Sequence, residues 1–162
     1  MADAARRPGA LDDVRVLDLA GPIGWYGSRL LADLGADVLR IEPPTGDPAR
    51  RRRPYVQHDD RASLTFWWYN AGKRSEVIDL DHAAGRERLL TLASEADLVF
   101  ESFPPGWLAE RGLDARAMQE RNPALVVTSI TPFGQTGPRA GWRGNRPHRD
   151  GNRRPCSSRR NA

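Results

Sequence analysis

Five short runs of apolar, mostly β-branched residues recur along the chain, and turn-forming residues separate them. They predict strands over residues 14–19, 37–42, 75–80, 97–102 and 125–130. Segments with helical apolar spacing lie between these runs. They predict helices after residue 22 and over residues 82–96, 105–111 and 115–121. This alternation predicts an α/β fold: a Rossmann-like, mostly parallel sheet with helices on both faces.

The first two long helices carry their own positional signals. Leu30, Leu31 and Leu34 are spaced to face the core from the first helix. Gly35 stands where a left-handed residue would end that helix. Asp81 directly precedes the next helix, and an aspartate there is expected to act as its N-cap.

Three segments lack a clear period. Residues 45–61 are polar and rich in arginine, which predicts an irregular surface loop. Residues 62–69 are apolar and aromatic and predict either a short helix or a buried loop, with the aromatic trio 67–69 in the core. Residues 133–141 are rich in glycine and predict a loop.

The length and composition limit the function classes. A chain of 162 residues with 39% hydrophobic and 28% charged residues is typical of one soluble globular domain. It lacks an apolar stretch of the ~20 residues that a membrane span needs, so we expect no membrane partner. One cysteine excludes an internal disulfide. Together with an N-terminus that lacks an apolar signal region, it predicts a cytoplasmic protein.

The net charge of +4 conceals two different parts. Residues 1–142 hold 18 basic and 20 acidic residues, a balance of −2, whereas residues 143–162 hold seven arginines and one aspartate, a balance of +6. The last twenty residues have no large apolar side chain, so we expect a disordered tail. We favour a shifted reading frame as its origin, with a nucleic-acid-binding arm as the alternative. The expected organisation is therefore a flexible leader (1–10), an α/β domain (11–142) and this tail.

In a parallel sheet, ligands bind beyond the carboxyl ends of the strands. That edge predicts candidate site segments at residues 20–25, 42–47, 80–82, 102–106 and 131–138.

Three features of the sequence could hold an anion or a nucleotide. The turn from Gly21 to Gly24 would present backbone N–H groups at a helix N-terminus, although close strand–helix packing also explains its glycines. Glu42 ends the second strand where a dinucleotide-binding fold places its ribose-binding acid. Lys73 and Arg74 precede the third strand and could clamp a phosphate, the alternative being a solvated turn.

Metal chemistry has little support in the sequence. The three histidines are scattered, and a single cysteine cannot anchor zinc. We therefore expect no metal site.

In combination, five stretches resemble, in the right order, the N-terminal part of the family III CoA-transferases, a group that includes formyl-CoA transferase, carnitine CoA-transferase and alpha-methylacyl-CoA racemase. The stretches are LDDVRVLDL (11–19), LLADLGADVLRIEPPTGDPAR (30–50), NAGKRSEVIDLD (70–81), DLVFESFPPG (97–106) and NPALVVTSITPFGQTGP (122–138).

The resemblance implies a CoA-binding domain in an intertwined homodimer of longer subunits, with acyl-CoA and carboxylic acids as substrates. Matched by position, the family's CoA contacts fall on Ala20, Gly21, Lys73, Arg74, Ile78, Asp81, Ser102, Phe103 and Pro104. The pattern departs at Ser102, where the family usually has asparagine. It departs again at Glu110, where the family's arginine is displaced to Arg111.

The resemblance also bears on catalysis. The family's transferases attack the thioester with an aspartate that lies downstream of the glycine-rich loop, whereas its racemases use a histidine and an aspartate. Asp150 and His148 match neither motif, so we assign no catalytic residue. We expect a fragment with little or no transferase activity that does not form the full dimer. A racemase-type fragment, a dinucleotide-binding domain and nucleic-acid binding through the tail are the alternatives.

Overall fold

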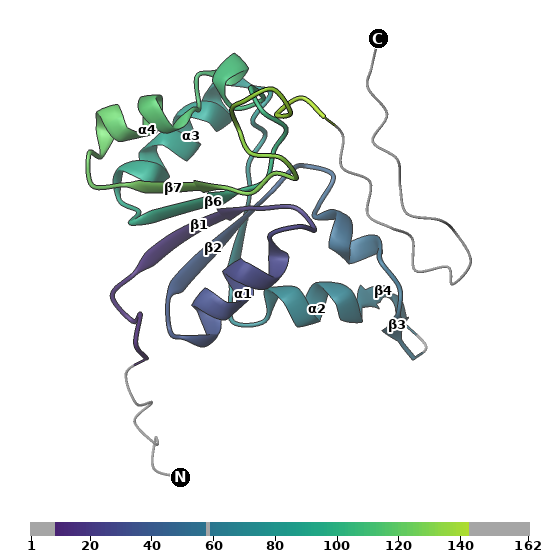
Figure 1. Ribbon diagram of the computed structural model, residues 1–162. Coiled ribbons are helices and arrows are strands. Elements are labelled where there is room, and N and C mark those ends of the chain that lie inside the picture. The colour runs from purple at the N-terminus through teal and green to yellow at the C-terminus, as the bar shows by residue number, and fades with distance from the viewer. Residues whose placement is uncertain (1–8, 58, 143–162) are drawn as a thin grey trace.

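A computed structural model describes residues 9–57 and 59–142 (Figure 1). The arginine-rich tail and nearly all of the predicted leader lie outside the described residues.

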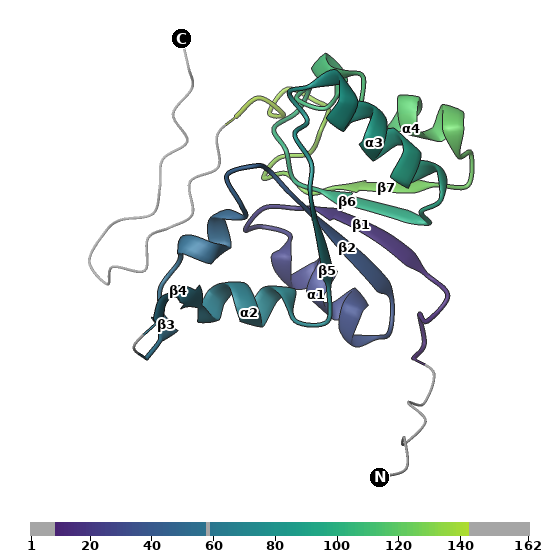
Figure 2. The same cartoon turned by 180° about the vertical axis from the view of Figure 1, so that it is seen from behind.

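The core of the fold is a sheet in which every strand pair is parallel. Its order is β5-β2-β1-β6-β7. The strands are β1 (Arg15–Leu19), β2 (Asp37–Glu42), β5 (Arg74–Val77), β6 (Leu98–Glu101) and β7 (Val126–Ser129). Helix α1 (Trp25–Asp33) lies on one face, and α3 (Ala83–Ser94) and α4 (Ala115–Arg121) lie on the other (Figures 1 and 2). The predicted α/β fold with its parallel sheet is confirmed.

Strand β1 shows why the central strands are apolar on both sides. Val16 packs in the cluster on the α1 face, whereas Leu17 and Leu19 pack in the larger cluster that contains Leu89 of α3. Side chains alternate along a strand, so a strand covered by helices on both faces needs apolar residues at nearly every position.

Helix α1 buries a different stripe from the one that its leucines predict. Trp25 and Ser28 are buried, whereas Leu30 and Leu34 are 43% and 51% exposed. Of the three leucines predicted to face the core, Leu31 alone packs against the cluster on the α1 face, in line with the stripe of Trp25 and Ser28. The predicted end of the helix is confirmed, since Gly35 follows it with a φ of +108°.

The segment predicted as an irregular loop is ordered. It forms a 3₁₀ turn η1 (Pro48–Arg51) and an antiparallel pair of short strands, β3 (Tyr55–Val56) and β4 (Asp59–Ser63). Asp47 is fully buried and accepts a hydrogen bond from the backbone N–H of Ala49, which caps the turn. Arg50, Arg51, Arg52 and Arg53 are exposed, so the predicted surface position is confirmed, whereas the predicted irregular conformation is wrong.

Helix α2 (Leu64–Asn70) follows, capped by Ser63, whose hydroxyl accepts from the N–H of Phe66. The alternative of a short helix is thus confirmed. The expectation that the aromatic trio is core is wrong for Trp67 and Trp68, which are 56% and 62% exposed.

The predicted N-cap of the next helix is also wrong. Helix α3 begins one residue later, at Ala83, with His82 in the N-cap position. The carboxylate of Asp81 instead accepts hydrogen bonds from Arg111. Arg111 belongs to the short 3₁₀ turn η2 (Ala109–Arg111), to which the helix predicted over residues 105–111 is reduced.

Among the described residues, none of the helices is long and apolar enough to cross a membrane.

Candidate functional site

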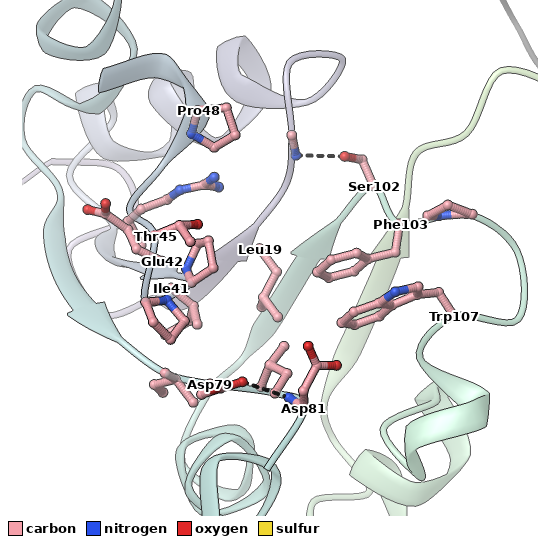
Figure 3. Close-up of a pocket in the computed structure, with 17 residues that line it drawn as sticks. Leu19, Ile41, Glu42, Thr45, Pro48, Asp79, Asp81, Ser102, Phe103 and Trp107 are labelled. Atoms are coloured by element: carbon pink, nitrogen blue, oxygen red, sulfur yellow. Dashed lines mark hydrogen bonds between the residues drawn. The ribbon is translucent and has the colours of Figure 1, made fainter. Parts of the chain in front are cut away.

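A pocket of about 550 Å³ opens at the carboxyl edge of the sheet, where β1, β2 and β6 end (Figure 3). Connections from β1 and from β6 run to opposite sides of the sheet, which creates a crevice at this point in folds of this class. The lining comes from the last residues of β1 and β2 and from the segments that follow the strands: Leu19, Gly21, Arg40, Ile41, Glu42, Pro43, Pro44, Thr45, Pro48, Ile78, Asp79, Leu80, Asp81, Ser102, Phe103, Pro104 and Trp107.

Six of the nine residues matched to CoA contacts line this pocket. They are Gly21, Ile78, Asp81, Ser102, Phe103 and Pro104. Ala20 is fully buried in the cluster on the α1 face. The structure thus gathers residues that are up to 83 positions apart in the sequence at one edge of the sheet.

The first glycine turn is tied to the turn after β6. The backbone N–H of Gly21 donates to the hydroxyl of Ser102 over 2.6 Å, as the dashed line in Figure 3 shows. A Cβ at Gly21 would lie 3.2 Å from the same oxygen, so the close approach favours glycine. This N–H, which the sequence suggested as an anion donor, already has a partner within the chain.

The adjacent cations Lys73 and Arg74 lie away from the pocket. The ammonium of Lys73 is buried and donates to Asp18 and to Ser28, in each case over 2.8 Å. Burial lowers the pKa of Lys73 below its usual range, although the charge of Asp18 opposes this. Arg74 donates twice to Asp37, at 2.9 and 2.6 Å. The two side chains therefore serve separate partners and do not form a common clamp.

Glu42 organises the pocket wall that follows β2. Its carboxylate accepts from the Arg50 guanidinium at 2.7 and 2.6 Å, from the Asp47 N–H at 2.9 Å and from the Ser75 hydroxyl. Burial alone would raise the pKa of Glu42, but these hydrogen bonds outweigh it and lower the pKa to about 2. These four hydrogen bonds engage both carboxylate oxygens of Glu42 within the chain, which leaves little capacity to bind a ribose hydroxyl.

Arg40, at the edge of the same pocket, is only 4% exposed. Its guanidinium pairs with Asp18 at 3.0 Å and with Asp47 at 2.6 Å, and it donates to the carbonyl of Ala20. It therefore joins the end of β1 to the wall after β2. The sequence offered no signal for this role, because an arginine inside an apolar strand is usually read as a surface position.

The opposite wall is aromatic. The rings of Phe103 and Trp107 stack 4.0 Å apart at an angle of 6°, and the guanidinium of Arg111 lies 3.7 Å from the Trp107 ring centre. In Figure 3, these rings lie on one side of Leu19, and Thr45 and Pro48 lie on the other side. Sequence analysis missed Trp107, since one aromatic residue after a Pro-Pro-Gly turn is no signal by itself.

The comparison with family models matches residues 11–147 to CoA-transferase family III. The chain belongs to this family.

Among the family's curated members, the chain is 47% identical over 133 residues to succinyl-CoA:(R)-benzylsuccinate CoA-transferase subunit BbsE of Thauera aromatica. That match covers 81% of this chain and 32% of the relative. It is 39% identical over 150 residues to the succinate–glutarate CoA-transferase of Agrobacterium fabrum, covering 89% of this chain and 38% of the relative. The chain therefore spans about a third of the length of these family III relatives.

A solved structure of the family has a similar fold. A crystal structure of a CaiB/BaiF family protein from Brucella suis is 40% identical and superposes with a TM-score of 0.77. The match covers 83% of this chain and 36% of that one.

Within residues 9–57 and 59–142, no group of three or more His, Cys, Asp or Glu side chains is arranged to hold a metal ion.

Proposed function

We propose that the pocket binds the CoA part of an acyl-CoA, and that the chain supplies the CoA-binding part of an acyl-CoA:carboxylate CoA-transferase. The observation that carries this proposal is the position of the pocket. It lies at the ligand-binding edge of a parallel sheet and gathers six of the residues matched to the family's CoA contacts.

The shape and chemistry of the pocket support a CoA ligand. Its volume of about 550 Å³ falls in the range of about 300–1,000 Å³ typical of small-molecule sites. The stacked Phe103 and Trp107 offer an aromatic surface next to which a purine base would lie, whereas Leu19, Ile41 and Ile78 offer apolar contact to a pantetheine arm.

The names of the relatives suggest which acyl groups to test first. Both curated relatives described above are named for reactions of succinyl-CoA or succinate. We propose a dicarboxylic acyl-CoA as the donor class, with a second carboxylic acid as acceptor.

Calorimetric titration of the 162-residue chain with CoA, succinyl-CoA and NADH tests the binding proposal. We expect binding of CoA and succinyl-CoA and a much weaker response to NADH, because the Glu42 carboxylate is fully engaged. Displacement of CoA by NADH would favour the dinucleotide alternative, and a chain that binds none of the three would contradict the proposal.

We expect CoA binding without turnover. The nucleophilic aspartate that the family resemblance implies has no matched counterpart in this sequence, and Asp150 and His148 lie outside the described residues. Chromatographic detection of glutaryl-CoA formed from succinyl-CoA and glutarate measures the activity. Turnover above the uncatalysed rate would contradict this expectation, and epimerisation of a 2-methylacyl-CoA would favour the racemase alternative.

We also propose a cytoplasmic protein that does not form the family's intertwined dimer. A single cysteine is in keeping with a reducing compartment. Light scattering after size exclusion would reveal the oligomeric state.

Deleting residues 143–162, which lie outside the described residues, should leave CoA affinity unchanged. If the deletion instead abolished a salt-sensitive binding of DNA, that result would support the nucleic-acid alternative.

A further inference from the structure

We infer that Asp81 sets the charge selectivity of the pocket mouth, and that Arg111 is the positioning residue that neutralises it. The inference rests on the proposed CoA function. It adds that Asp81 and Arg111 make the affinity of the pocket depend on the charge of the ligand.

Asp81 is an unusual residue to find in a pocket for a polyanion. Its side chain lines the pocket and is 74% exposed, so its carboxylate faces both the ligand space and solvent. A second acid, Asp79, lines the same side, and among the described residues its carboxylate has the exposed His82 at 3.5 Å as its one ionic partner. Unopposed, these two carboxylates would repel the phosphates of CoA.

Arg111 opposes the charge of Asp81 directly. Its Nη2 and Nε atoms donate to one oxygen of the Asp81 carboxylate at 2.8 and 3.1 Å. The other carboxylate close to Arg111 is that of Glu110, which lies 4.0 Å away and is largely exposed. Asp81 is therefore the main acidic partner of Arg111.

The aromatic wall holds the guanidinium where it can do this. Arg111 lies over the Trp107 ring at 3.7 Å and also donates to the Trp107 carbonyl at 3.2 Å. Its side chain is therefore only 23% exposed, and the stacked Phe103 supports the ring from the other side. The positive charge is therefore fixed beside two lining residues, Asp81 and Trp107, before a ligand arrives.

A second cation stands near the pair without replacing it. Arg86 donates to the backbone carbonyls of Leu80 and Asp81 rather than to the Asp81 carboxylate. Charge neutralisation of that carboxylate within the described residues therefore falls to Arg111.

An ion pair in which one partner is largely exposed, as Asp81 is here, contributes little to folding. Variants at these two positions should therefore fold, and changes in affinity can be read without loss of structure. Because solvent and salt screen exposed charges over about 10 Å at 0.1 M, the effect on binding should be several-fold.

The test titrates the full chain with CoA, dephospho-CoA and the uncharged pantetheine at low ionic strength. We expect Arg111→Gln to weaken CoA binding about fivefold, dephospho-CoA less, and pantetheine by less than about twofold. Asp81→Asn should strengthen CoA binding about threefold. The double variant should bind CoA within about twofold of the native chain, because Arg111 acts by opposing the Asp81 charge.

Arg121→Gln is the matched control. Arg121 makes an equally close two-bond pair with Glu87 between α4 and α3, at 2.7 and 2.9 Å, away from the pocket. This variant should leave all three affinities unchanged.

Two results would overturn the inference while leaving the proposed function intact. A double variant that binds CoA as weakly as Arg111→Gln would show that Arg111 contacts the ligand itself. Equal losses for CoA and pantetheine would show that Arg111 acts only by packing on Trp107. A native chain that binds no CoA would overturn both the proposed function and this inference.

Discussion

Buried carboxylates with dedicated partners hold the chain together around the pocket. Asp18 pairs with Lys73 and Arg40, whereas Glu42 pairs with Arg50. A buried charge without a partner is strongly unfavourable, so removing one member of such a pair costs more than the pair itself contributes. These residues stabilise the walls of the site through each other, and two of them, Arg40 and Glu42, also line the pocket.

Glu42 gives a pH-dependent prediction. Its pKa is lowered from 4.5 to about 2 in the folded chain, so its contribution is complete above pH 4.5 and is lost as the pH falls toward 2. We expect the free energy of unfolding of the native chain to fall by about 3 kcal/mol over this range from this group. Urea unfolding at several pH values measures it.

The control is Glu42→Gln, which should be less stable at pH 7 and should lose less stability as the pH falls from 4.5 toward 2. The variant should also bind CoA more weakly, because the hydrogen bonds from Asp47 and Arg50 to the Glu42 carboxylate hold residues 43–48 in place. Parallel pH profiles for the two chains would contradict the role assigned to Glu42.

Capping explains where helix predictions agree with the structure and where they differ. Helix α4 spans the predicted residues because Asp114 accepts from the N–H of Ala117, a contact three residues away. Asp81, which precedes α3, is also an aspartate, but its side chain pairs with Arg111 instead of capping the helix. A capping residue can be recognised locally, whereas a competing partner 30 positions away cannot.

The two aspartates form a matched pair for a stability measurement. Asp114→Ala should lower the free energy of unfolding by about 1 kcal/mol, because it leaves helix N–H groups without an acceptor. Asp81→Ala should lower it by less than about 0.5 kcal/mol, since it removes only an exposed ion pair. Denaturant titration compares them, and equal losses would mean that Asp81 caps α3 after all.

At the scale of the whole molecule, α1 and α2 present an apolar outer surface. Tyr26 and Leu30 on α1, Leu34 just after it, and Trp67 and Trp68 on α2 are all more than 40% exposed, and the two helices pack against each other (Figure 2). Exposed apolar side chains on neighbouring helices favour association.

We therefore predict concentration-dependent self-association through this surface. Replacing Leu34 and Trp67 by serine should shift the chain toward monomer over a tenfold range of protein concentration, with little change in Tm, because both side chains are half-exposed. Light scattering provides the measurement. Replacing Val126 on the edge strand β7 by serine is the control, and an equal effect there would place the association at the sheet edge.

The sequence by itself determined the order of strands and helices, the parallel sheet and the edge at which the pocket opens. Hydrophobic period and turn residues are local properties, and the carboxyl ends of parallel strands meet at one edge whatever their side chains are. Only the tertiary structure decided the partners. Lys73 meets Asp18 across 55 positions, Ser75 meets Glu42 across 33, and α1 buries Trp25 rather than Leu30. A side chain's partner depends on which strands become neighbours and how each helix is rotated, and neither is encoded in a short window of sequence.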